Sequence, residues 1–266
     1  MISDRTRDNG AFERDLTRAA GRLSAARRVV VFTGAGVSKE SGIATFRDPG
    51  EGLWAKYDPM QLATREAFVR DPAFVWSWYR ERFGKLREAQ PNPGHVALAE
   101  LERHVPSVIV VTQNIDGLHQ RAGSSDVIEL HGSAHRLKCL SERHTGFTWD
   151  DVRGSEAAEP PRCPACGDLI RPDVVWFGEQ LPHQAITRAC EVARQCAVML
   201  VVGTSGVVLP AASVPLLALE SGAFLIDVNL EPDEHSSLAH AFLQGPGGTV
   251  LPLLAARVAE GRRGTA

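Results

Sequence analysis

The chain has 266 residues, of which 44% are hydrophobic and 23% charged, so it is long enough to bury one main core and a smaller second one. A formal net charge of −3 provides no basic field of the kind that binding to nucleic acid requires. No apolar run has the length of a membrane span, and charged residues stand where a signal peptide needs an apolar stretch, which predicts a cytoplasmic protein.

The elements of the chain alternate between helical and strand patterns. Residues 1–15 are polar and are expected to be flexible, and residues 16–26 have helical spacing. Short apolar runs typical of buried strands follow at residues 29–32, 108–111, 127–130, 198–202 and 224–228. Such alternation predicts a parallel α/β sheet. A last short strand is expected after the loop at residues 245–248.

Two stretches interrupt this alternation. Residues 49–90 are rich in aromatic residues at helical spacing, and residues 134–182 contain three cysteines and several prolines. We predict that the first forms a helical module, that the second forms a zinc-ribbon-like module, and that together they make a small inserted domain. The remaining segments, 16–48, 91–133 and 183–258, are expected to form one Rossmann-like domain.

A glycine-rich turn, Thr33-Gly34-Ala35-Gly36-Val37-Ser38, follows the first predicted strand. Glycines between a strand and a helix let backbone amides approach a pyrophosphate closely, which indicates a dinucleotide site. The usual fingerprint has a third glycine where this chain has Lys39, so the match is partial. A tight connection without a ligand explains these glycines equally well.

Other predicted strands also end in polar or glycine-containing segments. Asn114 and Asp116 follow the strand at 108–111, and His131 follows the strand at 127–130. Because the carboxyl ends of parallel strands meet at one edge of a sheet, these segments are expected to converge on one crevice. Taken singly, the first two residues fit ordinary turn chemistry, and a lone histidine is more often structural.

Read together, these segments resemble the sirtuins, the NAD-dependent protein deacylases, and among them the bacterial members that remove acidic acyl groups. The resemblance is carried in order by GAGVSKESGIATFRD from Gly34, TQNIDGLH from Thr112, ELHG from Glu129, RPDVVWFGE from Arg171, GTS from Gly203 and VNLEP from Val228. It covers the chain from about residue 29 to residue 250. It implies an enzyme that consumes NAD and converts an acyl-lysine protein to nicotinamide, free lysine and O-acyl-ADP-ribose.

The resemblance also implies roles for individual residues. His131 is expected to be the general base, with Asn114 and Asp116 orienting the nicotinamide end of NAD. His119 and His135 are expected to be structural or to support the site. The residues expected to contact NAD are Gly34, Ala35, Gly36, Ser38, Thr45, Phe46, Arg47, Trp54, Gln113, Asn114, Ile115, Asp116, Gly203, Thr204, Ser205, Asn229, Leu230, Glu231 and Gly247.

Ala63, Tyr79 and Arg82 match the sirtuin subgroup that removes acidic acyl groups. A tyrosine and an arginine three residues apart share one face of a helix, where arginine can pair with a carboxylate and tyrosine can donate a hydrogen bond. Succinyl-lysine is therefore the expected substrate, with malonyl, glutaryl and acetyl groups also accepted; the alternative is an amphipathic helix with an exposed arginine. The residues expected to hold the substrate backbone as an added strand are Val175, Trp176, Phe177, Gly178 and Glu179.

The pair Cys163 and Cys166 forms a turn typical of zinc sites, and Cys139 lies upstream at a compatible distance. In the family the fourth ligand falls near Glu142, where this chain has no cysteine. Either Glu142 or His144 would complete a structural zinc site, or packing has replaced the metal.

Two other functions stay open from the sequence. The chain could transfer ADP-ribose to another nucleophile or hydrolyse NAD, and His131 together with the acyl-pocket residues argues against this. It could also be a non-catalytic NAD-sensing module, against which the intact set Asn114, Asp116 and His131 argues. Partners are expected to be acyl-lysine proteins, without nucleic acid or membrane, and the chain is expected to be a monomer.

Overall fold

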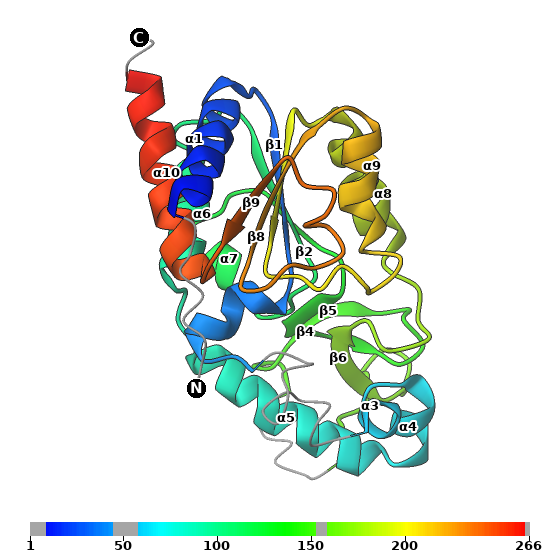
Figure 1. Ribbon diagram of the computed structural model, residues 1–266. Coiled ribbons are helices and arrows are strands. Elements are labelled where there is room, and N and C mark those ends of the chain that lie inside the picture. Colours follow the sequence, from blue (N-terminus) through cyan, green and yellow to red (C-terminus); the bar gives the residue numbers. More distant parts are fainter. Residues whose placement is uncertain (1–8, 45–57, 153–158, 264–266) are drawn as a thin grey trace, which may run out of the picture.

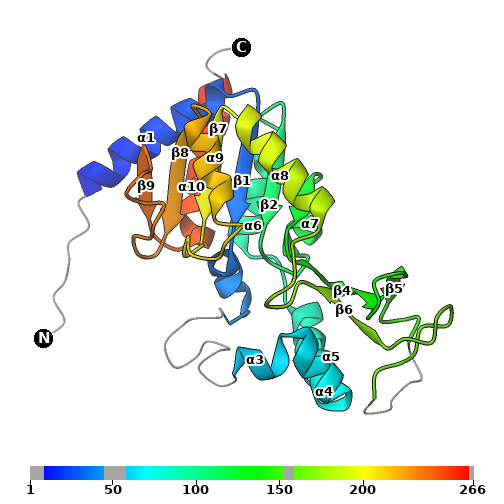
Figure 2. The ribbon, with the colours of Figure 1, turned by 90° about the vertical axis from the view of Figure 1, so that its right-hand side faces the viewer.

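A computed structural model describes residues 9–44, 58–152 and 159–263. Its larger domain is a six-stranded parallel sheet (Figures 1 and 2). The strands are, in spatial order, β3 (Val127–Glu129), β2 (Val108–Thr112), β1 (Val29–Thr33), β7 (Val198–Val202), β8 (Phe224–Asn229) and β9 (Ala241–Gln244). The five strands predicted from the apolar runs are thereby confirmed, as is the α/β class.

Helices cover both faces of this sheet, which explains why its central strands β1, β2 and β7 are nearly continuous apolar runs and do not alternate with polar residues. One face packs against α1 (Asn9–Ala25), α6 (Pro93–Leu101) and α10 (Gly247–Arg263). The opposite face packs against α8 (His183–Gln195) and α9 (Ser213–Glu220). Helix α7 (Leu118–Ala122) follows β2. None of the helices in the described segments is long and apolar enough to cross a membrane.

Two expectations about the ends of the chain are wrong. The first helix begins at Asn9 and not at residue 16, because the backbone N–H of Phe242 donates to Asp15 (3.1 Å) and so ties the first turns to β9. The expected last strand is instead α10, whose apolar residues recur at helical spacing and pack on the sheet. The glycine-containing segment at residues 245–248 thus leads into α10, and β9 lies before this segment.

In its described residues, the smaller domain combines three antiparallel strands with three helices (Figure 2). The strands are β4 (Gly132–Cys139), β5 (Thr145–Thr148) and β6 (Ile170–Val174), and the helices are α3 (Pro59–Leu62), α4 (Arg65–Arg70) and α5 (Pro72–Glu88). A single apolar cluster joins them, with Trp76, Tyr79 and Phe83 from α5 packed among Leu137, Trp149 and Trp176. The helical and cysteine-containing stretches therefore share one core.

The strand order places a topological switch point between β1 and β7. From β1 the chain runs outward to β2 and β3, and it then returns to β7 on the opposite side of β1. In open parallel sheets the crevice at such a point is where ligands bind, beyond the carboxyl ends of the strands. The small domain is inserted at this end, so the candidate site lies between the two domains (Figure 2).

Candidate active site

The glycine turn after β1 lies against the turn after β7. Gly36 N–H donates to the carbonyl of Gly203 (2.8 Å), and Gly34 N–H donates to that of Val202 (3.1 Å). A Cβ atom added to Gly36 would lie 2.7 Å from the Gly203 Cα, closer than real Cβ contacts come. These glycines are thus required for backbone contact across the switch point, a reason separate from the approach of a pyrophosphate. The segment that follows, η1 (Ala35–Ser41), is a 3₁₀ helix.

Ser38 joins the two polar residues that follow β2. Its hydroxyl donates to Asp116 Oδ2 (2.8 Å) and accepts from Asn114 Nδ2 (3.1 Å). Asn114 Nδ2 also donates to the carbonyl of Gly34 (3.1 Å), and Asp116 Oδ1 accepts from the Leu118 N–H (2.9 Å). Burial raises the pKa of Asp116, against the lowering effect of these hydrogen bonds. Ser38, Asn114 and Asp116 thus form a buried cluster of polar side chains, the polar floor of the candidate site.

His131 lies between β3 and β4, half-buried at the edge of this floor. Its Nδ1 is 2.9 Å from the carbonyl oxygen of Gln113, an oxygen that can only accept, which assigns the ring proton to Nδ1. The lone pair is therefore on Nε2, as a general base needs. Burial lowers the pKa of His131, and the hydrogen bond to Gln113 opposes this. The imidazole is therefore neutral at physiological pH.

The two neighbouring histidines have other contacts. His135 Nε2 is 2.8 Å from the carbonyl of Asp116, so it supports the backbone beneath the site. His119 is fully enclosed, 2.9 Å from the Thr33 hydroxyl, and burial lowers its pKa to about 3. A proton-transfer group needs a pKa nearer the working pH and access to the substrate, so His119 does not fit the role of general base.

The remaining predicted cofactor residues surround the carboxyl ends of the strands. Thr204 accepts hydrogen bonds from Gln113 Nε2 (3.1 Å) on its hydroxyl and from Asn229 Nδ2 (2.8 Å) on its carbonyl, which joins three strand ends. Ile115 packs against the small-domain core. Ala35 is half-buried in η1, Gly247 begins α10, and Ser205, Leu230 and Glu231 are exposed. Four further predicted residues lie outside the described part of the chain, namely Thr45, Phe46, Arg47 and Trp54.

The three predicted acyl-pocket residues lie in the small domain. Ala63 ends α3, and Tyr79 and Arg82 lie one turn apart on α5. Ala63 and Tyr79 are buried in the same apolar cluster. Arg82 is half-buried, with its guanidinium 5.5 Å from the ring centre of Trp78, and burial lowers its pKa. Arginine nevertheless keeps its charge in proteins, so this is a cationic group on the helix that contributes Tyr79 to the apolar cluster.

The segment after β6 connects His131 to Ala63. Val175 N–H donates to the carbonyl of His131, and Phe177 N–H donates to that of Ala63, at 2.9 and 2.8 Å. Phe177 and Gly178 are exposed, and Gly178 has a left-handed backbone with φ 84°. The backbone N–H groups of residues 175–177 thus all donate within the protein, because that of Trp176 donates to Glu179 Oε2 (2.9 Å).

Sequence reasoning did not assign a role to Arg171, which the structure buries completely. Its guanidinium pairs with both carboxylate oxygens of Glu179 and lies 3.5 Å from the ring centre of Trp176. An arginine beside Ile170 and Pro172 was the available signal, since a buried charge requires a partner.

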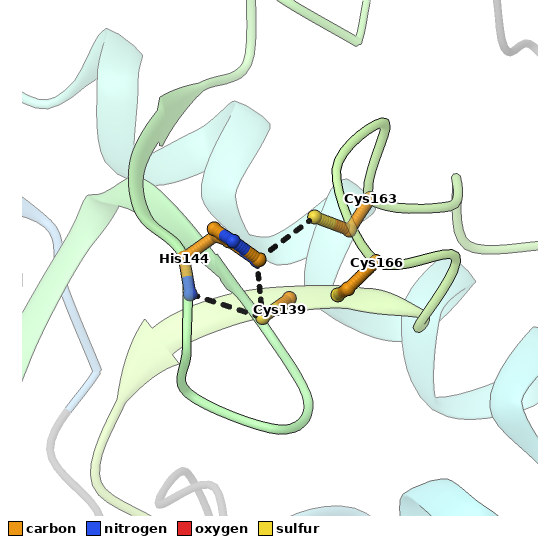
Figure 3. A group of neighbouring side chains, drawn as sticks. All are labelled: Cys139, His144, Cys163 and Cys166. Carbon is orange, nitrogen blue, oxygen red and sulfur yellow. Dashed lines mark hydrogen bonds between the residues drawn. The ribbon is translucent and has the colours of Figure 1, made fainter.

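Three cysteines and a histidine converge at the outer end of the small domain (Figure 3). The potential ligand atoms of Cys139, His144, Cys163 and Cys166 all lie within 4.8 Å of one another. His144 Nδ1 is 3.5 Å from the Cys163 sulphur and 3.8 Å from the Cys139 sulphur. Glu142 is not in this group, because its carboxylate pairs with Lys138 (2.8 Å). Three thiols and one imidazole in such a cluster suit tetrahedral zinc.

Comparison with known proteins agrees with this geometry. Residues 34–210 match the Sir2 family. An NAD-dependent protein deacylase 2 of Pyrobaculum aerophilum is 52% identical over 89% of this chain and 93% of its own length. An NAD-dependent protein deacylase 1 of Pseudomonas aeruginosa is 51% identical over 90% and 97%. A solved Sir2 structure with a deacetylated p53 peptide and 3′-O-acetyl-ADP-ribose has a TM-score of 0.81 and 36% identity, covering 92% of this chain and 98% of that one.

A parallel sheet with a polar switch-point crevice and an inserted small domain therefore defines this chain as a sirtuin-type enzyme. The chain belongs to the Sir2 family, whose model spans both the glycine turn and the base.

Proposed function

We propose that this protein removes acyl groups from protein lysine side chains at the expense of NAD, and that acidic acyl groups, succinyl above all, are its preferred substrates. The observation that carries the proposal is the pair of backbone hydrogen bonds from residues 175 and 177. They connect the base His131 to the pocket residue Ala63, so that one bound acyl-lysine could reach both.

When bound, NAD supplies an activated ribose carbon that accepts the acyl oxygen of lysine as nicotinamide leaves. The chain's own residues orient the substrates, exclude water from the site and accept a proton. Asn114, Asp116 and Ser38 already hold one another before any ligand binds, so little ordering remains for the ligand to induce. His131 Nε2 then accepts a proton from a ribose hydroxyl, which activates that hydroxyl.

The acyl preference is supported by the chemistry of the pocket. Arg82 offers a cationic, two-pronged donor, Tyr79 a buried hydroxyl, and Ala63 a side chain small enough to leave room for a four-carbon acyl group. A succinyl group has a carboxylate that can accept hydrogen bonds from these donors, whereas an acetyl group has no carboxylate. A buried site built for hydrogen bonding discriminates strongly against substrates that lack the partner.

A panel of peptides tests this proposal. One lysine peptide carrying acetyl, malonyl, succinyl or glutaryl groups is incubated with the protein and NAD, and the deacylated peptide is quantified by mass spectrometry. We expect succinyl to give the highest kcat/KM, about tenfold or more above acetyl. No nicotinamide release with any peptide would refute the deacylase activity, and equal rates would refute the acyl preference.

We further propose that Cys139, His144, Cys163 and Cys166 bind one structural zinc ion that holds the cysteine-containing turns together. His131 precedes the first residue of β4 and Cys139 is its last, so the length of this strand separates the cluster from His131 and the proposed role of the metal is structural. The support is the donor set, three sulphurs and one nitrogen within 4.8 Å of one another.

Replacing His144 tests the zinc site. In His144→Ala we expect zinc content, measured by mass spectrometry, to fall from about one ion per chain, and stability to fall by roughly 4 kcal/mol, or about 10 °C in melting temperature. His144→Cys is expected to retain the ion. Glu142→Gln is the matched control, because Glu142 pairs with Lys138 outside the cluster. If wild-type protein from which zinc has been removed melts at the same temperature as untreated protein, the proposed zinc site is contradicted.

A further inference from the structure

The buried hydroxyl of Tyr79 has a hydrogen-bond partner that is distant in sequence, Trp176. Tyr79 is 4% exposed, and its oxygen accepts a hydrogen bond from Trp176 Nε1 at 2.8 Å. An indole N–H can only donate, whereas a phenol has one proton and also accepts. The Tyr79 proton must therefore point away from Trp176.

The proton in question stays on the oxygen under ordinary conditions. Burial raises the pKa of Tyr79 far above its usual value of 10.0, against smaller lowering effects of the Trp176 hydrogen bond and the charges of Arg171 and Arg82. Tyr79 is thus a neutral hydroxyl that can donate at any physiological pH. Tyr79 and Arg82 lie one turn apart on α5.

Trp176 is in turn held in place by an ion pair. The Arg171 guanidinium lies 3.5 Å from its ring centre, and Glu179 Oε2 accepts from both the Trp176 backbone N–H and Arg171 Nη2, each at 2.9 Å. Burial alone would raise the pKa of Glu179, but the hydrogen bonds and charge of Arg171 lower it, so the pair is ionised. A cation on the face of an indole ring also strengthens its N–H as a donor.

We propose that Trp176 is a positioning residue for acyl specificity: by donating to the Tyr79 oxygen, it turns the Tyr79 proton toward the carboxylate at the end of an acidic acyl chain. This inference rests on the proposed acyl preference. Without the indole N–H, the hydroxyl can rotate and its buried oxygen loses a donor, which weakens its hold on a carboxylate. An acetyl group has no carboxylate, so its removal is insensitive to this orientation.

The test compares Trp176→Phe, Tyr79→Phe and the double variant on succinyl and acetyl peptides. We expect Trp176→Phe to lower kcat/KM for the succinyl peptide about tenfold and that for the acetyl peptide by less than about threefold. In the Tyr79→Phe background the same change is expected to have no further effect on the succinyl peptide, because the hydroxyl that it orients is gone.

Trp149→Phe is the matched control. Trp149 is buried in the same apolar cluster and donates its own N–H to the carbonyl of Ala134 (2.8 Å), so its replacement also removes one indole hydrogen bond from this core. We expect it to leave the succinyl-to-acetyl ratio unchanged. If Trp176→Phe does not fold, benzothienylalanine at position 176 keeps the ring shape without the N–H, and the same selective loss is expected.

Equal losses on both peptides, or the same loss with and without the Tyr79 hydroxyl, would overturn the role of Trp176 while leaving the acyl preference intact. A wild-type protein without a preference for succinyl, or a Tyr79→Phe variant with unchanged succinyl activity, would overturn the acyl preference and this inference with it. The two failures are therefore distinguishable in one set of measurements.

Discussion

Replacing His131 with alanine is expected to lower kcat for deacylation at least about a hundredfold, because a positioned general base contributes roughly 10²- to 10⁴-fold. The Nδ1 contact with Gln113 fixes the ring so that Nε2 is the basic atom. By contrast, His119 contacts the buried Thr33 hydroxyl and His135 Nε2 contacts the carbonyl of Asp116. Quantifying the deacylated peptide by mass spectrometry measures the effect.

His183→Ala is the control, since His183 is an exposed histidine at the start of α8 on the outside of the large domain. Both variants are expected to melt within about 2 °C of wild type, as half-exposed and exposed sites tolerate such changes. A His131→Ala variant that folds normally and turns over at near wild-type rate would contradict the assignment.

The pH profile provides a second readout of the same base. A general base works when deprotonated, so activity falls as the pH drops through its pKa. Since burial lowers the pKa of His131 below its usual 6.5, the acid limb of kcat should have its midpoint below pH 6.5.

Replacing Arg82 with methionine is expected to lower kcat/KM for a succinyl peptide about a hundredfold and that for an acetyl peptide by less than about threefold. Methionine preserves much of the apolar length of the side chain but removes the charge, and a desolvated carboxylate left without its cationic partner is strongly unfavourable. Kinetics on the two peptides with the same flanking sequence measure the change.

Arg80→Met is the matched control, because Arg80 is an exposed arginine on the same helix, two residues away and on another face. It is expected to leave both rates unchanged. An equal loss on succinyl and acetyl peptides in Arg82→Met would show that Arg82 supports the fold and does not read the acyl group.

Much of the large domain could be predicted from local sequence, because strands buried on both faces are continuous runs of β-branched residues. The C-terminal helix was missed for a local reason as well. Its first turn contains Gly247 and Gly248, and Pro252 lies within it, all residues that usually mark loops. Packing of its apolar face on the sheet outweighs these preferences.

The parts of the site that could not be predicted depend on contacts distant in sequence. Tyr79 and Trp176 are 97 residues apart, and no local pattern indicates that their polar atoms meet. The choice between Glu142 and His144 depends on the turn between β4 and β5, where Glu142 adopts a left-handed backbone with φ 60° and reaches Lys138. Sequence spacing alone is compatible with both.

In the proposed reaction, the acyl group of lysine is transferred to ADP-ribose as NAD is split. The most direct measurement is mass spectrometry of all products after a single incubation of the protein with NAD and a succinyl-lysine peptide. We predict nicotinamide, free lysine peptide and succinyl-ADP-ribose in equal amounts. Nicotinamide accompanied by plain ADP-ribose, with the peptide still succinylated, would contradict the account.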